Sequence, residues 1–269
     1  MNKDNNNCTT IEYALGPRLR AFSTTRAGGT SRGSYSTFNI NPFCGDAPEA
    51  VAANRSLLCR ELGVDERHLL LPRQVHGTHT LRVDRQLLEA GEEELAARLD
   101  GVDALITDLA GVCIGVSTAD CVPVLLYDEE HHAAAAVHAG WRGTAKRIVA
   151  AAVEAMKAAY GTRPAALRAA IGPSISQAAF EVGGEVYDAF IAAGFREQEV
   201  ARRYPAAGGG SKWHIDLWAA NALTLTELGV DLCRIHVAGV CTYTHSDTFF
   251  SARKEGIRSG RMYSGVILQ

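Results

Sequence analysis

The sequence predicts an α+β fold, a single layered domain in which mixed β-sheets are flanked by helices. Three apolar stretches between Val112 and His138 follow one another with short connections, which favours antiparallel pairing. The candidate helices interrupt the other strands without the regular strand-helix alternation of a doubly wound sheet. No linker rich in Pro, Gly or Ser divides the chain, so we expect one domain over residues 1–269, with a flexible stretch at 1–10.

Eight stretches are predicted to be strands because they are short, apolar or alternating, and bounded by turn residues. In chain order they are residues 69–83, 104–107, 112–117, 123–127, 133–138, 167–171, 235–240 and 262–268.

Four helices are expected between these strands. One covers residues 48–62 and is closed by Gly63, and a second covers residues 186–193. A third extends from Thr144, as its cap, to a stop at Gly161, and a fourth extends from the cap Asp216 to near Gly229. The acidic patch at residues 89–94 is expected to be a solvated helical face.

Composition excludes several classes of function. The 27 basic and 30 acidic residues nearly balance, which does not favour docking to nucleic acid or anionic lipid. No apolar run has the length of a secretory signal or a membrane span, so we expect a cytoplasmic protein. The seven cysteines are scattered rather than clustered, which indicates reduced thiols. With no exposed apolar stripe or coiled-coil pattern, a monomer is expected.

Three segments place a reactive residue at the end of a strand. They are Arg73-Gln-Val-His76, Ser117-Thr-Ala-Asp-Cys121 and Val137-His138 with the Ala-Gly-Trp-Arg-Gly that follows. Two imidazoles and one thiolate are a ligand set that Zn²⁺ prefers, and three protein ligands leave a fourth coordination position open, as in catalytic sites. An open position lets the ion lower the pKa of a bound water to about 7.

The spacing of these residues leaves other interpretations open. His76 and His138 can instead be histidines satisfied by hydrogen bonds at strand ends, with Cys121 a small buried residue. Alternatively, Cys121 acts as a nucleophilic thiolate with His138 as its base, which requires only one histidine in contact.

Several longer motifs carry a resemblance to a known family. The motifs are RQVHG, DGVDALITD, STADCVPVLLYD, VHAGWRGT, IGPSISQAAFEVG, CTYTHSDTFFSARKEG and SGRMYSGVIL. In order and spacing they resemble the YfiH/laccase-domain proteins, also called multicopper polyphenol oxidase, purine nucleoside phosphorylase-like, or peptidoglycan editing factor. The resemblance extends from about Phe22 to Leu268.

The resemblance implies a single layered α+β domain in which His76, Cys121 and His138 bind zinc. It also implies an activity on purine nucleosides: phosphorolysis of adenosine, inosine and methylthioadenosine, together with hydrolytic deamination of adenosine. The substrates would then be small molecules, a purine nucleoside and phosphate.

Phosphorolysis requires a site that holds an anion. Arg26, Arg142 and Arg253 are the candidates, because a guanidinium group binds phosphate in a bidentate manner. For each arginine, an ordinary salt bridge is the alternative role.

Further polar residues in the motifs are candidates for contacts with the nucleoside; they are Asn39, Gln74, Thr118 and His245. Asp120, next to Cys121, is a candidate catalytic residue that shuttles protons during deamination. Its alternative role is structural, as a turn cap or as a hydrogen-bond acceptor for a ligand histidine.

Three other functions are considered. A copper-dependent polyphenol oxidase requires a blue-copper centre and further histidine-rich motifs. The chain has only nine histidines and no HxH pair, so its sequence does not favour this function. Hydrolytic editing of a peptidoglycan precursor would use the same metal site or Cys121. The third alternative is a binding module without enzymatic activity.

Overall fold

The computed structural model describes residues 8–206 and 208–269. Part of the stretch expected to be flexible, residues 1–7, lies outside this range, while Thr10 begins the first strand. Helices and strands are mixed along the chain, and both parallel and antiparallel pairs occur, so the predicted fold class is confirmed.

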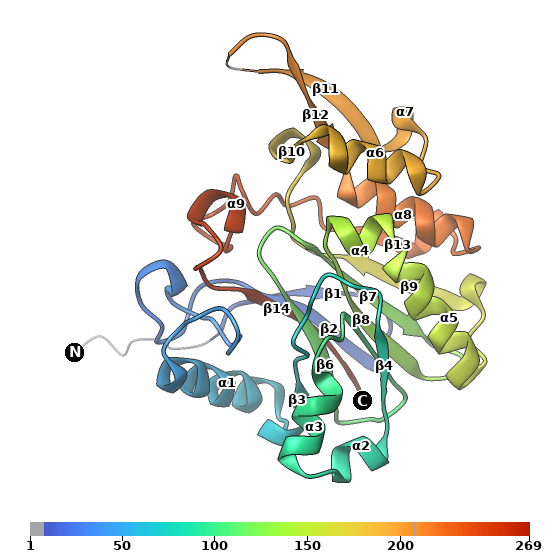
Figure 1. The fold of residues 1–269 in the computed structure, drawn as a ribbon. Coiled ribbons are helices and arrows are strands. Elements are labelled where there is room, and N and C mark those ends of the chain that lie inside the picture. Colours follow the sequence, from blue (N-terminus) through green and yellow to red (C-terminus); the bar gives the residue numbers. More distant parts are fainter. Residues whose placement is uncertain (1–7, 207) are drawn as a thin grey trace.

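The strands of the described residues form three sheets (Figure 1). The six-stranded sheet has the order β13 (Ile235–Val237), β9 (Leu167–Ile171), β7 (Val122–Asp128), β8 (Ala133–Ala139), β5 (Ala104–Thr107), β4 (Thr80–Val83). The five-stranded sheet has the order β1 (Thr10–Tyr13), β2 (Leu19–Thr24), β14 (Met262–Leu268), β6 (Cys113–Thr118), β3 (Leu69–Leu70). The three-stranded sheet has the order β10 (Glu181–Val182), β12 (Ser211–Ile215), β11 (Ala201–Pro205).

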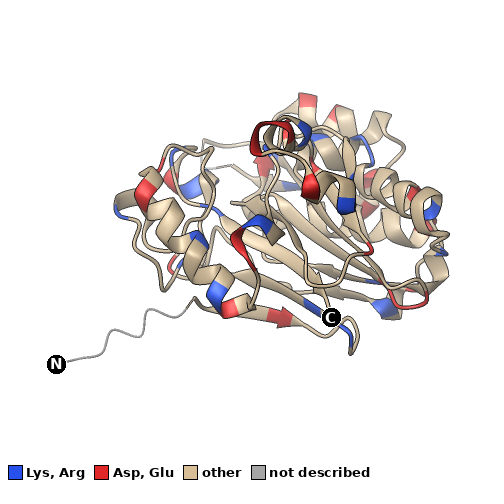
Figure 2. Cartoon of the chain, turned by 90° about the horizontal axis from the view of Figure 1, so that it is seen from below, with Lys and Arg blue, Asp and Glu red and all other residues tan. Residues whose placement is uncertain are grey.

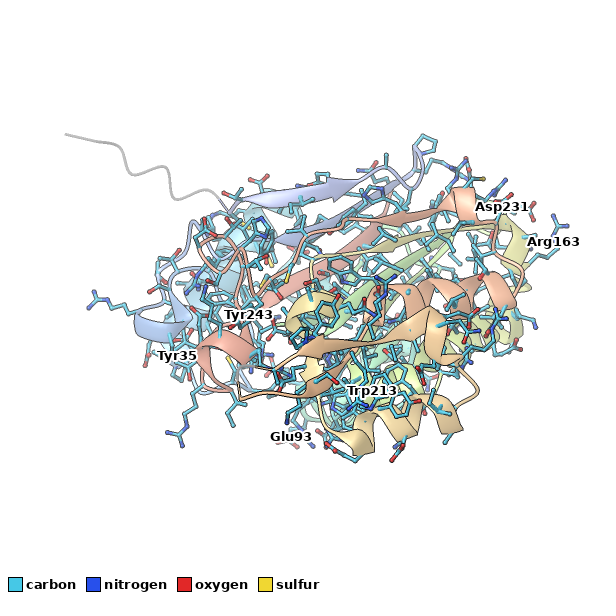
Figure 3. The ribbon with its side chains drawn as sticks, turned by 90° about the horizontal axis from the view of Figure 1, so that it is seen from above. Tyr35, Glu93, Arg163, Trp213, Asp231 and Tyr243 are labelled. Atoms are coloured by element: carbon cyan, nitrogen blue, oxygen red, sulfur yellow. The ribbon has the colours of Figure 1, made fainter. Side chains whose placement is uncertain are left out.

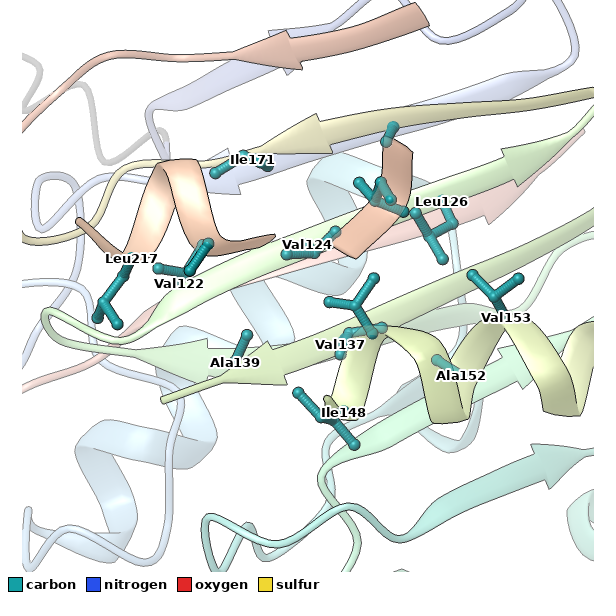
Figure 4. Packing of buried hydrophobic residues seen from close by; sticks show 14 of the residues in the cluster. Val122, Val124, Leu126, Val137, Ala139, Ile148, Ala152, Val153, Ile171 and Leu217 are labelled. Carbon is teal, nitrogen blue, oxygen red and sulfur yellow. The ribbon is translucent and has the colours of Figure 1, made fainter. Parts of the chain in front are cut away.

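The two large sheets pack face to face, and the alternation of side chains along β7 shows why. Leu125 and Tyr127 point into the core between the sheets, whereas Val122, Val124 and Leu126 point to the opposite face. That opposite face is covered by the helices α5 (Ile148–Tyr160) and α8 (Leu217–Glu227) (Figure 4). Because both faces are covered, every residue of β7 is buried, which explains its continuous apolar sequence.

The outer face of the five-stranded sheet is covered by α1 (Pro48–Leu62). Phe22 of β2 and Tyr263 of β14 pack there with Leu58 of this helix. The fold is therefore layered, with helices on the outer face of each large sheet (Figure 1).

The predicted ends of three helices are confirmed. Gly63 after α1 and Gly161 after α5 both adopt the left-handed conformation, which glycine enters without a steric cost. Asp216 caps α8 by accepting a hydrogen bond from the backbone N–H of Ala219 at 2.9 Å. The remaining helices are α2 (Arg85–Glu89), α3 (Glu92–Leu99), α4 (Trp141–Ala145), α6 (Gly184–Ala192), α7 (Glu197–Val200) and α9 (Ala252–Glu255).

Three sequence-based boundaries are wrong. Residues 69–83 do not form one strand, because β3 ends at Leu70 and β4 begins only at Thr80. Thr144 does not cap α5: it lies inside α4, and the residue before α5 is Arg147 in a left-handed conformation. The strand expected at 235–240 ends at Val237. In the acidic patch, Glu92 to Glu94 form the exposed first turn of α3, where negative charge is favourable.

The three-stranded sheet projects beyond the two large sheets, next to α6 and α7 (Figure 1). There, Trp213 of β12, which is labelled in Figure 3, lies beside α6. Its ring stacks on that of Tyr187 of α6, with ring centroids 4.1 Å apart. Acidic and basic residues are interspersed over the chain (Figure 2). In residues 8–206 and 208–269, no helix is both long and apolar enough to cross a lipid bilayer.

Candidate metal centre

The pairing of two adjacent strands brings Cys121 next to the end of β8. Val122 at the start of β7 pairs with Ala139 at the end of β8. Cys121, one residue earlier, therefore lies opposite Gly140, one residue later. The backbone of Gly140 is so close that an added Cβ would lie 3.0 Å from Cys121 Sγ. The turn between β6 and β7 thus places the thiol beside the last residues of β8.

A second pairing places a carboxylate beside His138. Ala104 of β5 pairs with Val137 of β8, so Asp103 lies opposite His138. The His138 backbone N–H donates to the Asp103 carbonyl at 2.8 Å, and His138 Nδ1 lies 2.8 Å from Asp103 Oδ1. Both side chains are buried. Because an ionised carboxylate only accepts hydrogen bonds, Nδ1 donates to it, and Nε2 is the ring nitrogen left to face a metal.

The same carboxylate holds the segment that carries His76. This residue lies between β3 and β4 and has a φ of 62°, in the left-handed region. The backbone N–H groups of Val75, His76 and Gly77 all donate to Asp103, at 3.3, 2.9 and 2.7 Å. The turn at His76 is therefore fixed by a residue that precedes a different strand.

The three side chains predicted as ligands converge. His76 Nε2 lies 3.8 Å from Cys121 Sγ, and the donor atoms of His76, Cys121 and His138 all lie within 4.8 Å of one another. In tetrahedral zinc sites the donor atoms are about 3.6 Å apart, as follows from metal-ligand distances near 2.1–2.3 Å. In the described part of the chain, no other group of His, Cys, Asp and Glu side chains converges in this way.

The residues present fit a metal ion. Gly140 leaves the space between the donors open: an added Cβ would lie 2.8 Å from His76 Cδ2 as well as close to Cys121 Sγ. Burial alone raises the pKa of the Cys121 thiol, but His138 and His76 outweigh this effect and lower it below its usual range. Burial also raises the pKa of Asp103, and the hydrogen bonds from His138 and the backbone N–H groups outweigh it, so that this carboxyl stays ionised.

The three donors lie on the wall of a cavity of about 380 Å³. Two cationic side chains, Arg73 and Arg261, line it together with the apolar Phe43 and Ile257, which are 52% and 80% exposed. Thr118 also lines it, and the Thr118 hydroxyl is buried without a hydrogen-bond partner among the described residues. The complete lining is Asn41, Phe43, Arg73, Gln74, His76, Ser117, Thr118, Ala119, Cys121, His138, Ala252, Ile257 and Arg261.

Of the polar residues expected to contact a nucleoside, Gln74 and Thr118 line this cavity. The Gln74 side chain is bound to the backbone of Ser117, donating to its carbonyl at 2.9 Å and accepting from its N–H at 2.7 Å. Asn39 is fully buried outside the lining and donates to Asp46 at 2.9 Å. His245 is exposed, and its Nδ1 lies 3.0 Å from the Cys241 carbonyl.

Asp120 adopts a left-handed φ of 84° in the turn before Cys121. Both of its carboxylate oxygens have partners: the Thr242 hydroxyl donates to Oδ1 and the Arg253 backbone N–H donates to Oδ2, each at 2.6 Å. Asp120 therefore ties the turn that carries Cys121 to the C-terminal part of the chain.

The three arginines predicted to bind phosphate lie outside the cavity lining. The Arg26 guanidinium pairs with Glu255 at 2.7 Å. The Arg253 guanidinium donates to the carbonyl of Glu181 at 2.9 Å. Arg142 is exposed and lies over the Trp141 ring.

Sequence reasoning did not single out Asp103, Arg73 or Arg261. Each stands in a motif that was recognised, in DGVDALITD, RQVHG and SGRMYSGVIL. For Asp103 the available signal was an acidic residue directly before a buried strand, between Val102 and Ala104.

The fold is layered and mixed, and a His-Cys-His group lies on the wall of a cavity. These two features place the chain in the class of proteins with a candidate metal centre. Residues 20–269 match a family model described as multi-copper polyphenol oxidoreductase laccase. The chain belongs to this YfiH/laccase-like family, which confirms the resemblance of the motifs.

Relatives in this family are similar over nearly the whole chain. A purine nucleoside phosphorylase of Bacteroides thetaiotaomicron is 46% identical over 247 residues, which are 92% of this chain and 90% of the relative. Adenosine deaminase RL5, from an unknown prokaryotic organism, is 43% identical over 92% of this chain and 93% of its own length. The crystal structure of YlmD from Geobacillus stearothermophilus has a TM-score of 0.86 and 29% identity, covering 96% and 94% of the two chains. The chain is therefore an enzyme of this family.

Proposed function

We propose that the chain is a zinc-dependent purine nucleoside enzyme. Its reactions are phosphorolysis of adenosine, inosine and methylthioadenosine, and hydrolytic deamination of adenosine. The observation that carries this proposal is the convergence of His76, Cys121 and His138 on the wall of a cavity that also contains Arg73 and Arg261. The names of two relatives, a purine nucleoside phosphorylase and an adenosine deaminase, support both reactions.

The choice of zinc rests on the donor set. His76 and His138 would hold the ion through imidazole nitrogens and Cys121 through its thiolate, a combination that suits borderline-soft Zn²⁺. When bound, the ion supplies Lewis-acid chemistry, by polarising an electrophile or acidifying a water molecule. Three protein donors leave a coordination position open for this electrophile or water molecule.

The cavity wall suits both parts of the substrate. In phosphorolysis a phosphate oxygen forms a bond to the ribose C1′ while the bond from C1′ to the purine nitrogen breaks, and the purine leaves with that electron pair. Arg261 and Arg73, which line the cavity, bind the phosphate, with Arg73 giving up its ion pair to Asp100, and the Thr118 hydroxyl donates to it. Phe43 and Ile257 offer apolar surface to the purine.

The remaining candidate residues are assigned by their contacts. Gln74 is proposed to contact the nucleoside from the cavity wall, and Arg142 and His245, which are exposed, are proposed to reach substrate from outside it. Arg26, Asn39 and Arg253 are proposed to support the site through their bonds to other segments. For Asp120, whose two oxygens are occupied, we propose the structural one of its two expected roles.

Copper is the alternative metal, because the family model describes a multi-copper oxidoreductase. A blue-copper site uses two histidines, a cysteine and a weak axial ligand. A multi-copper enzyme also needs further histidine clusters, and among the described residues the group of His76, Cys121 and His138 stands alone. Stoichiometric copper with fast phenol oxidation and no purine turnover would favour this alternative.

We further propose that the enzyme works as a cytoplasmic monomer. The compartment is supported by the seven free cysteines, including the exposed Cys233, which suit a reducing environment.

The deciding experiment incubates the purified chain with adenosine, with and without phosphate, and separates adenine, inosine and hypoxanthine while its metal content is measured. The proposal expects one zinc ion per chain, adenine only when phosphate is present, and inosine under both conditions. Absence of all these products, with hydrolysis of a peptidoglycan precursor instead, would favour the editing function.

A further inference from the structure

We infer that Asp103 is a positioning residue for the metal centre: one buried carboxylate holds both His138 and the turn that carries His76. This inference rests on the proposed metal site, and it assigns a role to a residue that does not itself belong to the converging donor group.

The first part of this role concerns the imidazole of His138. The ring is 2% exposed, and Asp103 is fully buried, so no bulk water can replace their 2.8 Å hydrogen bond. The bond fixes the ring plane and keeps the proton on Nδ1, so that Nε2 is the atom presented to a metal.

The second part concerns the backbone around His76. A left-handed φ of 62° costs a residue with a side chain about 1 kcal/mol or more. Three consecutive N–H groups, from Val75 to Gly77, point at the Asp103 carboxylate and compensate this cost. The direction of the His76 side chain therefore depends on Asp103.

The acceptor capacity of Asp103 is fully used. Oδ1 accepts from His138 Nδ1 and the His76 N–H, and Oδ2 accepts from the N–H groups of Val75 and Gly77. A carboxylate offers about four acceptor positions. Substitution by Asn turns one oxygen into an NH₂ group, which cannot accept and faces donors instead, so two of the four bonds are lost.

The chain contains a matched control, Asp128, at the end of β7 that lies away from Cys121. Asp128 is also fully buried, its Oδ2 lies 2.8 Å from His131 Nδ1, and its Oδ1 accepts from the backbone N–H groups of Glu130 and His131 at 3.0 and 3.2 Å. β7 separates it from Cys121 by roughly 20 Å, at about 3.3 Å per strand residue. Asp128→Asn therefore reproduces the chemical change of Asp103→Asn away from the metal centre.

The test compares the wild-type chain with Asp103→Asn and Asp128→Asn. Zinc affinity is measured by competition with a chromophoric chelator, and the visible absorption of bound Co²⁺ reports the geometry of the donor set. We expect Asp103→Asn to weaken zinc binding by about 10- to 100-fold, the range observed for such hydrogen-bond partners, and to change the Co²⁺ spectrum. Asp128→Asn should leave the zinc affinity and the Co²⁺ spectrum unchanged.

A second variant keeps the test decisive if Asp103→Asn does not fold. In Gly77→Ala, the added Cβ would lie 3.3 Å from Asp103 Oδ2, so the carboxylate has to shift by a few tenths of an ångström while keeping its charge. It should weaken zinc binding less than Asp103→Asn, and in the same direction. Wild-type zinc affinity and a wild-type Co²⁺ spectrum in Asp103→Asn, or in Gly77→Ala where Asp103→Asn does not fold, would overturn the inference alone, whereas failure of the wild-type chain to bind zinc would overturn the proposed function with it.

Discussion

Gly140 lies against the sulfur of Cys121, so that a methyl group added at this glycine would be 3.0 Å from Sγ. The same methyl group would be 2.8 Å from His76 Cδ2. Gly140→Ala is therefore expected to push the donors apart. Overpacking typically costs about 1–3 kcal/mol, so zinc affinity should fall by roughly 10- to 100-fold.

Gly184→Ala is the control for this prediction. Gly184 begins α6, and an added Cβ there meets no atom within 4 Å. Zinc content and adenosine turnover of the two variants are compared after identical purification. Equal zinc affinity in Gly140→Ala and Gly184→Ala would show that the metal does not bind between these donors.

Cys121→Ser separates the two possible roles of the thiol. A serine hydroxyl stays protonated at neutral pH, so a ligand role predicts a loss of zinc affinity larger than about 100-fold, beyond the effect of an outer hydrogen-bond partner. Phosphorolysis and deamination should then be lost together with the metal. A variant that retains zinc but has no activity would instead identify Cys121 as a nucleophile.

Arg73→Ala tests the anion-binding wall of the cavity. Removing a charge-assisted contact costs about 1.5–3 kcal/mol, so phosphorolysis should lose about 10- to 100-fold in kcat/KM for phosphate. Deamination, which uses no phosphate, should change much less.

The matched variant for Arg73→Ala is Arg163→Ala, since the exposed Arg163 is likewise paired with one carboxylate, that of Glu130, and lies outside the cavity lining. It should leave the KM for phosphate near the wild-type value. Equal losses of phosphorolysis in Arg73→Ala and Arg163→Ala would show that Arg73 does not bind the phosphate.

Asp120→Asn tests the structural role of the turn before Cys121. An Asn side chain can still accept from the Arg253 N–H and donate to the Thr242 oxygen, but it replaces two charge-assisted hydrogen bonds by weaker neutral ones. We expect a loss of stability of about 1–3 kcal/mol, visible as a lower Tm, and equal effects on both reactions. Selective loss of deamination at an unchanged Tm would instead indicate a proton shuttle.

Much of the fold is predictable where one local rule decides the structure. Gly63, Gly161 and Asp216 mark helix ends because left-handed backbone and side-chain caps depend on neighbouring residues only. The apolar strands from Cys113 to Ala139 are equally clear, because they are buried on both faces.

The unpredicted parts depend on contacts that are distant in sequence. The sequence predicts no strand at β11, because its exposed Arg202 and Arg203 lack the alternation of a core strand. The local pattern predicts one strand over 69–83, because the left-handed turn at His76 is stabilised by Asp103, which no local pattern reveals. Likewise Thr144 resembles a cap in sequence, but α4 continues through it.

The site likewise contains residues that the sequence predicts and residues whose roles depend on the fold. His76, Cys121 and His138 can be selected by residue type and motif, because few side chains bind zinc. The roles of Asp103 and Arg261 follow from strand register and cavity shape, which become visible only in the folded chain.

The most direct test of the account is adenosine turnover by the chain after removal of its metal with a chelator and again after readdition of one equivalent of zinc. The account predicts that formation of adenine and inosine disappears with the metal and returns with zinc, in the wild-type chain but not in Cys121→Ser. Full turnover by the metal-free chain would contradict it.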